Sequence, residues 1–186
     1  MFLGAYQTQA GMVAVSPNVA DNYVRFGGYG GPLAVISNGC DFEYWHNTGA
    51  HEFSPQASGR PVAFHQGRIN DELDYHLIHK LLHCLPDWDF WFCGRLDPRQ
   101  AAWKLLLDRT NFVHYGQVNL ERVAELSKSA HVGLMPFVDD VMIHDSWRLK
   151  AFEYVACGLG VVTVEIDALR SFPEQVKIAK TAETFR

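Results

Sequence analysis

The sequence lacks any apolar run that approaches the roughly 20 residues needed to cross a bilayer. Its opening stretch, MFLGAYQTQAGMVAV, lacks the basic segment that begins a signal peptide. An excess of positive charge is also missing: the formal net charge is −5, so electrostatics give no reason to expect nucleic acid as a partner. Together these absences predict a soluble, cytoplasmic protein.

Closely spaced cysteines are absent as well. The four cysteines, Cys40, Cys84, Cys93 and Cys157, stand far apart and form no CxxC pair. Three of them lie in apolar stretches, so reduced structural thiols are favoured over disulfides. With 48% hydrophobic and 20% charged residues, the 186-residue chain has the composition of a globular protein. Its length suffices for one core, or for one domain with an appendage. No internal repeat or low-complexity segment is visible.

Apolar strands and amphipathic helices alternate along most of the chain. A turn-rich connector, TGAHEFSPQASGRP at 48–61, precedes this pattern. We expect strands at 62–65, 90–93, 111–115, 131–136 and 161–164, with helices at 71–85, 98–107, 120–127 and 147–157. Strands separated by helices are typical of βαβ units, and continuous apolar strands are typical of sheets buried on both faces. The pattern therefore predicts an α/β fold: a Rossmann-like parallel sheet with helices on both faces.

The segment before the connector has a strand–helix–strand pattern of its own. MVAVSPNVADNYVRFGG reads as a strand followed by a helix, with Ser16 as its N-cap and Pro17 in its first turn. A second strand is expected at 33–36, and it ends in the turn formers Ser37, Asn38 and Gly39.

Three of the expected strands are followed within two residues by glycine, at Gly67, Gly94 and Gly116. Glycine at the carboxyl end of a strand lets a ligand approach the backbone, and parallel sheets bind ligands outside these ends. The alternative is that the glycines only make tight turns. Three occurrences favour a shared ligand-binding edge.

The stretch DSWRLKAFEYVACGLG, at 145–160, combines charged residues with an apolar stripe. Asp145 and Glu153 are eight residues apart, so both can face one side of a helix, and Lys150 lies one turn before Glu153. A cation with two carboxylates can hold an anionic ligand that also carries hydroxyl groups. A buried strand is expected directly after Gly160.

Several of these segments resemble the group 1 nucleotide-sugar-dependent glycosyltransferases of the GT-B fold: VAVSPNVADNYVRFG, LAVISNGCDFEYW, the glycine-terminated strands and LKAFEYVACGLGVVT. The resemblance covers nearly the whole chain, and K-x-x-E-Y-x-A-x-G before an apolar strand is its most specific part. It departs from the usual pattern in having Asp145 in place of a first glutamate, Gly160 in place of a proline, and no basic residue at Leu73 or Asp74.

The resemblance implies a domain organisation. GT-B enzymes have two Rossmann-like domains, of which the first binds the acceptor and the second binds the donor. We expect residues 1–31 to be a remnant of the acceptor-binding domain and residues 32–186 to be the donor-binding domain, with its C-terminal helices truncated. Such a piece should bind nucleotide weakly without transferring sugar alone.

The resemblance also implies roles for individual residues. Lys150 and Arg68 would neutralise the diphosphate, Glu153 would accept hydrogen bonds from the ribose, and Asp145 would contact the sugar. Asp145 and Glu153 are thus the expected catalytic pair. The backbone near Gln117 and Val118 would meet the base, and Gly67 and Gly94 would border the phosphates. No metal or other cofactor is required, and UDP- or GDP-sugars are the expected donors.

The implied function is transfer of a sugar from a nucleotide-diphosphate sugar to a glycan or lipid-linked acceptor, in polysaccharide biosynthesis. The acceptor would bind through the other domain, and only the full-length protein would contact a membrane peripherally. Two alternatives stay open: a UDP-sugar 2-epimerase-like protein, and a non-catalytic nucleotide-binding or scaffold module.

The helix expected at 71–85 carries His76, His79 and His83 on one face, a spacing that can bind zinc. That face is opposite the apolar residues of the helix, so an exposed face is favoured over a zinc site.

Overall fold

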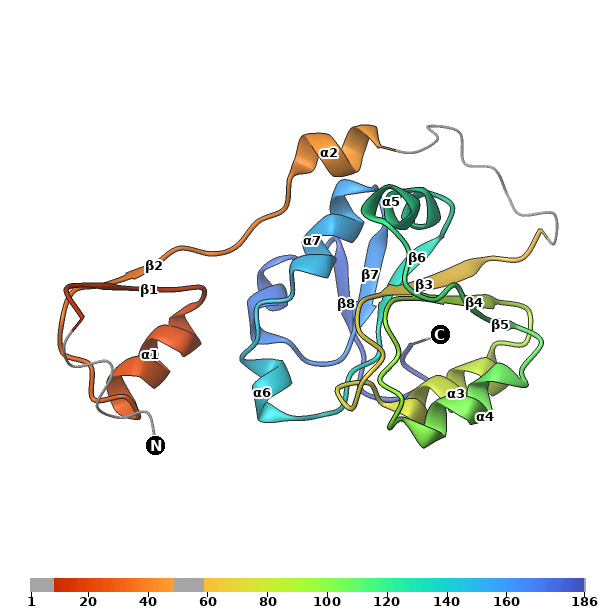
Figure 1. Cartoon of the computed structure of the whole chain (residues 1–186), viewed down its shortest axis with the longest axis horizontal. Helices are drawn as coiled ribbons and strands as arrows, with labels where there is room; N and C mark the ends of the chain where they lie inside the picture. Colours follow the sequence, from red (N-terminus) through yellow and green to blue (C-terminus); the bar gives the residue numbers. More distant parts are fainter. Residues whose placement is uncertain (1–8, 49–58, 186) are drawn as a thin grey trace.

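The computed structural model describes residues 9–48 and 59–185, which form a small N-terminal unit and a larger sheet unit (Figure 1). The N-terminal unit contains β1 (Met12–Ala14), α1 (Pro17–Arg25) and β2 (Leu33–Val35). An extended segment then leads to α2 (Phe42–Asn47), which lies against α7 of the sheet unit. No helix in the described ranges has the length and apolar character to cross a membrane.

The N-terminal unit forms as its sequence predicts. The Ser16 hydroxyl accepts a hydrogen bond from the Val19 amide at 3.2 Å, and Pro17 occupies the first turn of α1. Strand β2 pairs in parallel with β1, with Met12 opposite Leu33. The β1–β2 pairing therefore joins residues 33–35 to the same small unit as β1 and α1.

The sheet unit is built on six parallel strands in the order β5-β4-β3-β6-β7-β8. They are β3 (Val62–Gln66), β4 (Asp89–Cys93), β5 (Phe112–His114), β6 (Val132–Met135), β7 (Gly160–Thr163) and β8 (Val176–Ile178). The expected α/β class and Rossmann-like sheet are thus confirmed. Strand β8 was not predicted, because it has only three residues and one of them is Lys177.

Helices cover both faces of this sheet (Figure 1). On one face lie α3 (Tyr75–Cys84), the 3-10 turn η1 (Ala101–Trp103) and α4 (Lys104–Leu107); on the other lie α5 (Leu120–Lys128) and α7 (Leu149–Ala156). Two short elements, α6 (Val141–His144) and η2 (Asp167–Ser171), complete the unit. Right-handed crossovers explain the arrangement, since the chain runs outward through β3, β4 and β5 and then returns to β6 on the other side of β3.

The core lies between the sheet and these helices. Phe90, Trp91 and Phe92 of β4 are each at most 1% exposed, as expected for core aromatics. The inner face of α3 is buried through the expected residues Leu77, Ile78, Leu81 and Leu82. Its three histidines, His76, His79 and His83, are exposed, and the described residues contain no cluster of three or more metal-binding side chains.

Helix α3 begins four residues later than the expected start at 71. The Asp74 carboxylate caps it by accepting from the Leu77 amide at 2.8 Å. The Asp74 amide is itself bonded to the Pro136 carbonyl at 2.9 Å, and Leu73 pairs with Phe137 in an antiparallel bridge. These backbone bonds hold Leu73 and Asp74 outside the helix, after a turn at 71–72.

The three strand-end glycines lie side by side at one edge, as predicted. Their φ angles are 129° at Gly67, 140° at Gly94 and 70° at Gly116, which only glycine adopts without strain. The Gly94 amide donates to the Gly116 carbonyl at 2.8 Å, and the Gly67 amide donates to the Cys93 carbonyl at 3.0 Å. A Cβ at Gly94 would overlap the Gly67 carbonyl, so this edge requires glycine.

Candidate active site

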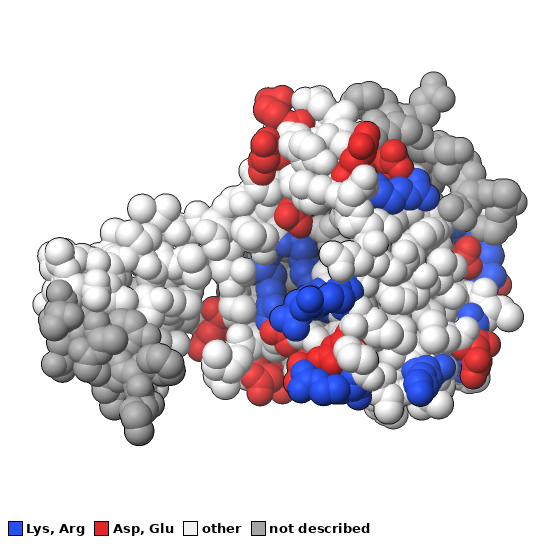
Figure 2. All heavy atoms as spheres, in the orientation of Figure 1, with Lys and Arg blue, Asp and Glu red and all other residues white. Residues whose placement is uncertain are grey.

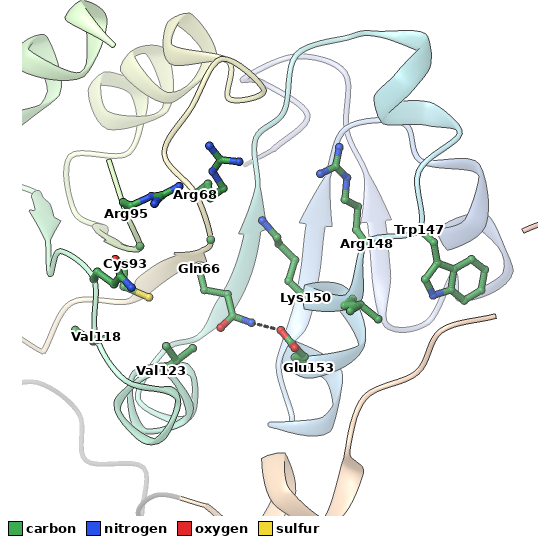
Figure 3. Close-up of a pocket in the computed structure, with 14 residues that line it drawn as sticks. Gln66, Arg68, Cys93, Arg95, Val118, Val123, Trp147, Arg148, Lys150 and Glu153 are labelled. Carbon is green, nitrogen blue, oxygen red and sulfur yellow. Dashed lines mark hydrogen bonds between the residues drawn. The ribbon is translucent and has the colours of Figure 1, made fainter. Parts of the chain in front are cut away.

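A cavity of about 610 Å³ opens at the carboxyl ends of the central strands, beside the start of α7 (Figure 3). It lies where the strand order reverses between β3 and β6, the place where open α/β sheets bind ligands. Its lining residues are Gln66, Gly67, Arg68, Cys93, Gly94, Arg95, Gln117, Val118, Val123, Trp147, Arg148, Leu149, Lys150 and Glu153. The structure therefore brings together seven residues that the sequence singled out: Gly67, Arg68, Gly94, Gln117, Val118, Lys150 and Glu153.

Four cations converge on this cavity. Arg68 and Arg95 come from the loops after β3 and β4, and Arg148 and Lys150 come from the start of α7 (Figure 3). Figure 2 shows Lys and Arg side chains gathered in a hollow of the sheet unit. Neither Arg68 nor Arg95 forms an ion pair with any residue the structure describes. Two guanidinium groups are therefore available to an anion.

Lys150 is the most enclosed of the four cations. Its Nζ lies 5.0 Å from the centroid of the Phe137 ring, and a Cβ built on Gly67 would lie 2.5 Å from it. Burial, together with the neighbouring Arg148 charge, lowers the pKa of Lys150 to about 8. The lysine thus keeps its charge at neutral pH while it is poorly compensated, which favours an incoming anion.

Arg148 is held in place by three contacts. Its Nη1 pairs with Glu72 Oε2 at 3.0 Å, its Nε donates to Ser146 Oγ at 2.7 Å, and its Cζ lies 4.6 Å from the centroid of the Phe137 ring. The Phe137 ring therefore makes cation–π contacts with both Arg148 and Lys150.

Glu153 faces the cavity from the second turn of α7. Its Oε2 accepts a hydrogen bond of 2.6 Å from Nε2 of Gln66, at the end of β3 (Figure 3). Burial raises the pKa of Glu153, while the Lys150 charge and the Gln66 bond act in the opposite direction. An anchored carboxylate next to a cation pocket can accept hydrogen bonds from hydroxyl groups.

Asp145 lies elsewhere. Helix α7 begins only at Leu149, because residues 146–148 do not continue the helix, so Asp145 and Glu153 do not share a helix face; that expectation was wrong. Asp145 is the C-cap of α6, and its carboxylate accepts a hydrogen bond from Asn18 Nδ2 at 3.1 Å. It lines a separate cavity of about 340 Å³ between the two units, which shares only Trp147 with the first cavity.

Sequence reasoning missed several lining residues. Arg95 follows Gly94 as Arg68 follows Gly67, so the repeated Gly-Arg pair was a readable signal. Arg148 and Gln66 had no such signal, because their roles depend on contacts with Glu72 and Glu153 that are distant in the sequence. Cys93 also lines the cavity, but burial raises the pKa of its thiol to about 12, so it stays protonated.

His65, next to this site, is fully buried. Its Nδ1 bonds to the Leu134 carbonyl at 2.9 Å, so Nδ1 carries the proton, and Nε2 has no partner in the described structure. Burial and the nearby Lys150 charge lower the pKa of His65 well below 6.5. His65 is therefore a neutral link between β3 and β6.

One curated protein and several solved structures are similar to this chain. No protein-family model matches the sequence. The curated protein TuaH of Bacillus subtilis (strain 168) has a proposed role as a teichuronic acid biosynthesis glycosyltransferase. It is 26% identical over 134 residues, which cover 69% of this chain and 33% of TuaH.

Solved structures match almost the whole chain. A sucrose-phosphate synthase from Thermosynechococcus elongatus has a TM-score of 0.74 at 17% identity, covering 98% of this chain and 48% of its own. A glycosyltransferase from Rickettsia africae ESF-5 has a TM-score of 0.75 at 14% identity, covering 98% and 54%. The chain spans about half of these structures and a third of TuaH. It therefore has the Rossmann-like fold of the GT-B glycosyltransferases, as the resemblance in its sequence implied.

Proposed function

We propose that this chain carries the donor site of a glycosyltransferase, and that its cavity holds the nucleoside diphosphate of a nucleotide-sugar. The observation that carries the proposal is the convergence of Arg68, Arg95, Arg148 and Lys150 beside Glu153, at the switch point of the sheet. A diphosphate is a compact anion, and it needs several donors at close range. The glycosyltransferase relatives support this interpretation over the 2-epimerase and scaffold alternatives.

The cations have distinct roles in this proposal. Arg68 and Arg95, which have no ion-pair partner among the described residues, would bind phosphate oxygens from the β3 and β4 side. Lys150 would contact the oxygen that carries the growing charge as the bond from the diphosphate to the anomeric carbon breaks. With four cations at hand, we expect no divalent metal to be needed for this charge. Gly67 and Gly94 leave room for the phosphates against the backbone.

The nucleoside would extend from the phosphates toward α7 and the loop after β5. Glu153 would accept hydrogen bonds from the ribose hydroxyls, and the backbone around Gln117 and Val118 would contact the base. Val118 and Val123, which line that end of the cavity, offer an apolar wall for it.

The sugar and the acceptor would approach through the region near Trp147, which lines both cavities. Asp145, in the neighbouring cavity, would contact the sugar there. The acceptor oxygen would form the new bond to the anomeric carbon as the bond from that carbon to the diphosphate breaks, and the hydroxyl proton would pass to the departing diphosphate. We propose that the acceptor is a glycan or a lipid-linked sugar chain. The reaction would serve polysaccharide biosynthesis, and the protein would act in the cytoplasm.

Thermal-shift measurements test the nucleotide. The chain should gain Tm with either UDP or GDP in a screen that includes ADP, CMP and dTDP, because a ligand that binds only the folded state stabilises it. Lys150→Met, which removes one of the four cations, should reduce the gain strongly. Leu105→Met, on the exposed surface of α4, is the control that should retain it. A flat response to all five nucleotides would contradict the proposal.

A further inference from the structure

Gln66 joins the two sides of the switch point. It is the last residue of β3 and only 6% exposed. Its backbone amide donates to the Tyr154 hydroxyl at 2.7 Å, and its side-chain Nε2 donates to Glu153 Oε2 at 2.6 Å. Two consecutive residues of α7 are therefore tied to one residue of β3, which fixes the turn of α7 that carries Glu153.

The Tyr154 side chain is closely packed. Its ring is fully buried, lies edge-on to Phe64 at 6.1 Å between centroids, and occupies the space where Gly133 has no Cβ. Because Tyr154 is buried and bonded to the Gln66 amide, it keeps the backbone of the neighbouring Glu153 next to β3. The remaining freedom of Glu153 is rotation of its own side chain, and the Gln66 amide removes that.

The paired side chains keep acceptors for a ligand. Within the described structure, no donor contacts Oε1 of Glu153 or Oε1 of Gln66, and both residues line the cavity. An amide oxygen and a carboxylate oxygen can accept hydrogen bonds and cannot donate them while the carboxylate is ionised. They match two adjacent hydroxyl groups and would repel a phosphate.

We propose that Gln66 is a positioning residue for nucleoside recognition: it orients Glu153, so that the Gln66–Glu153 pair selects a sugar with a vicinal diol over its 2′-deoxy form. This inference rests on the proposed function, since it assumes that a nucleoside diphosphate occupies the cavity. A methionine at 66 would have similar length without the donor, and Glu153 would then rotate and protonate more readily.

Binding of ribose and deoxyribose nucleotides tests the inference. UDP, GDP, their 2′-deoxy forms and inorganic pyrophosphate are titrated calorimetrically into the wild-type chain and into Gln66→Met, with circular dichroism to verify folding. The wild-type chain should prefer a ribose nucleotide over its deoxy form by about tenfold or more, the value of a hydrogen bond to a charged group. Gln66→Met should lose most of that preference while its affinity for pyrophosphate stays unchanged.

Two further variants sharpen the test. Gln100→Met makes the same change at a position outside the cavity, where the side chain makes no cap hydrogen bond, and should keep the ribose preference. Gln66→Glu places two carboxylates together, so its ribose preference should be lost at high pH and return on acidification, as the pair takes up one proton.

The outcomes separate the two proposals. If pyrophosphate and the nucleotides all fail to bind the wild-type chain, the proposed function fails and the inference fails with it. If nucleotides bind but folded Gln66→Met keeps the full ribose preference, the donor site stands and the role of Gln66 is refuted. The same holds if the wild-type chain binds both sugar forms equally.

Discussion

Lys150 lines the proposed diphosphate site and lies near Arg148, so its protonation should depend on whether an anion is bound. The pKa of Lys150 is lowered to about 8 in the ligand-free protein, mainly by burial and then by Arg148. A bound diphosphate would stabilise the protonated form. Affinity for a diphosphate should therefore hold at neutral pH and fall as the pH rises through about 8, with proton uptake on binding above that value.

Calorimetry over a pH series, in buffers of different ionisation enthalpy, measures both the affinity and the proton uptake. Lys150→Met should bind weakly with a flat pH profile. Lys150→Arg should keep its charge throughout, because a guanidinium does not titrate in this range. An unchanged alkaline slope in Lys150→Met would assign the titration to another group.

Substitution of Gly94 tests the close approach of the backbone at Gly67 and Gly94. A Cβ there would overlap the Gly67 carbonyl, and the φ of 140° is strained for any other residue. Gly94→Ala should lower the free energy of unfolding by about 1–3 kcal/mol. Urea denaturation measures this. Gly30→Ala is the matched control, since a Cβ there meets nothing within 4 Å. Equal stability of the two variants would contradict the close approach.

The residue scale also marks the limit of sequence reasoning. Local patterns predicted the cation and carboxylate of α7, because Lys150 and Glu153 lie within one helix and their spacing fixes their side. The position of Asp145 was predicted wrongly, because α7 begins only at Leu149 and residue spacing alone does not show where a helix begins. The bond from Gln66 to Glu153 spans 87 residues and had no local signature.

Among the elements, α3 offers a test of local stability separate from the site. Asp74 caps this helix by accepting from the Leu77 amide. Asp74→Ala should cost about 0.5–2 kcal/mol in the free energy of unfolding, while Asp74→Asn, which can still cap, should cost much less. Pyrophosphate affinity should stay unchanged in both, because α3 does not line the cavity. A stable Asp74→Ala would show that packing alone starts the helix.

The elements that the sequence predicted are the long, strongly patterned ones. Strands β3 and β4 each contain a run of three consecutive apolar residues, and α5 matches its expected bounds within one residue. The short elements α2, α6 and β8 were missed, because four to six helical residues or three strand residues carry too little periodicity. Tertiary contacts, such as the packing of α2 on α7, stabilise them instead.

For the whole molecule, His65 links stability to pH. Because its pKa lies well below 6.5 in the folded state, the unfolded chain binds the proton more readily. The contribution of neutral His65 is therefore complete above pH ~6.5 and is lost as the pH falls toward the lowered value, with a slope of up to about 1.4 kcal/mol per pH unit.

Urea unfolding across this acidic range measures that slope. His65→Phe, which keeps an aromatic ring beside Phe92 and Phe137, should flatten it even if it lowers stability overall. His83→Gln, at an exposed position of α3, should leave the slope unchanged. An equal acid slope in the wild-type chain and His65→Phe would remove His65 as the cause.

The pairing of β3 with β6 has a consequence for synthesis of the chain. His65 and Leu134, which bond across these strands, are 69 residues apart, and β4 and β5 occupy the other side of β3. The ribosome adds ~5–20 residues per second, so the 69 residues between His65 and Leu134 take roughly 3–14 seconds to synthesise. During that time the edge of β3 that pairs with β6 has no partner strand. An unpaired apolar edge is a template for intermolecular pairing, so the nascent chain is most prone to aggregation in this interval, before β6 arrives.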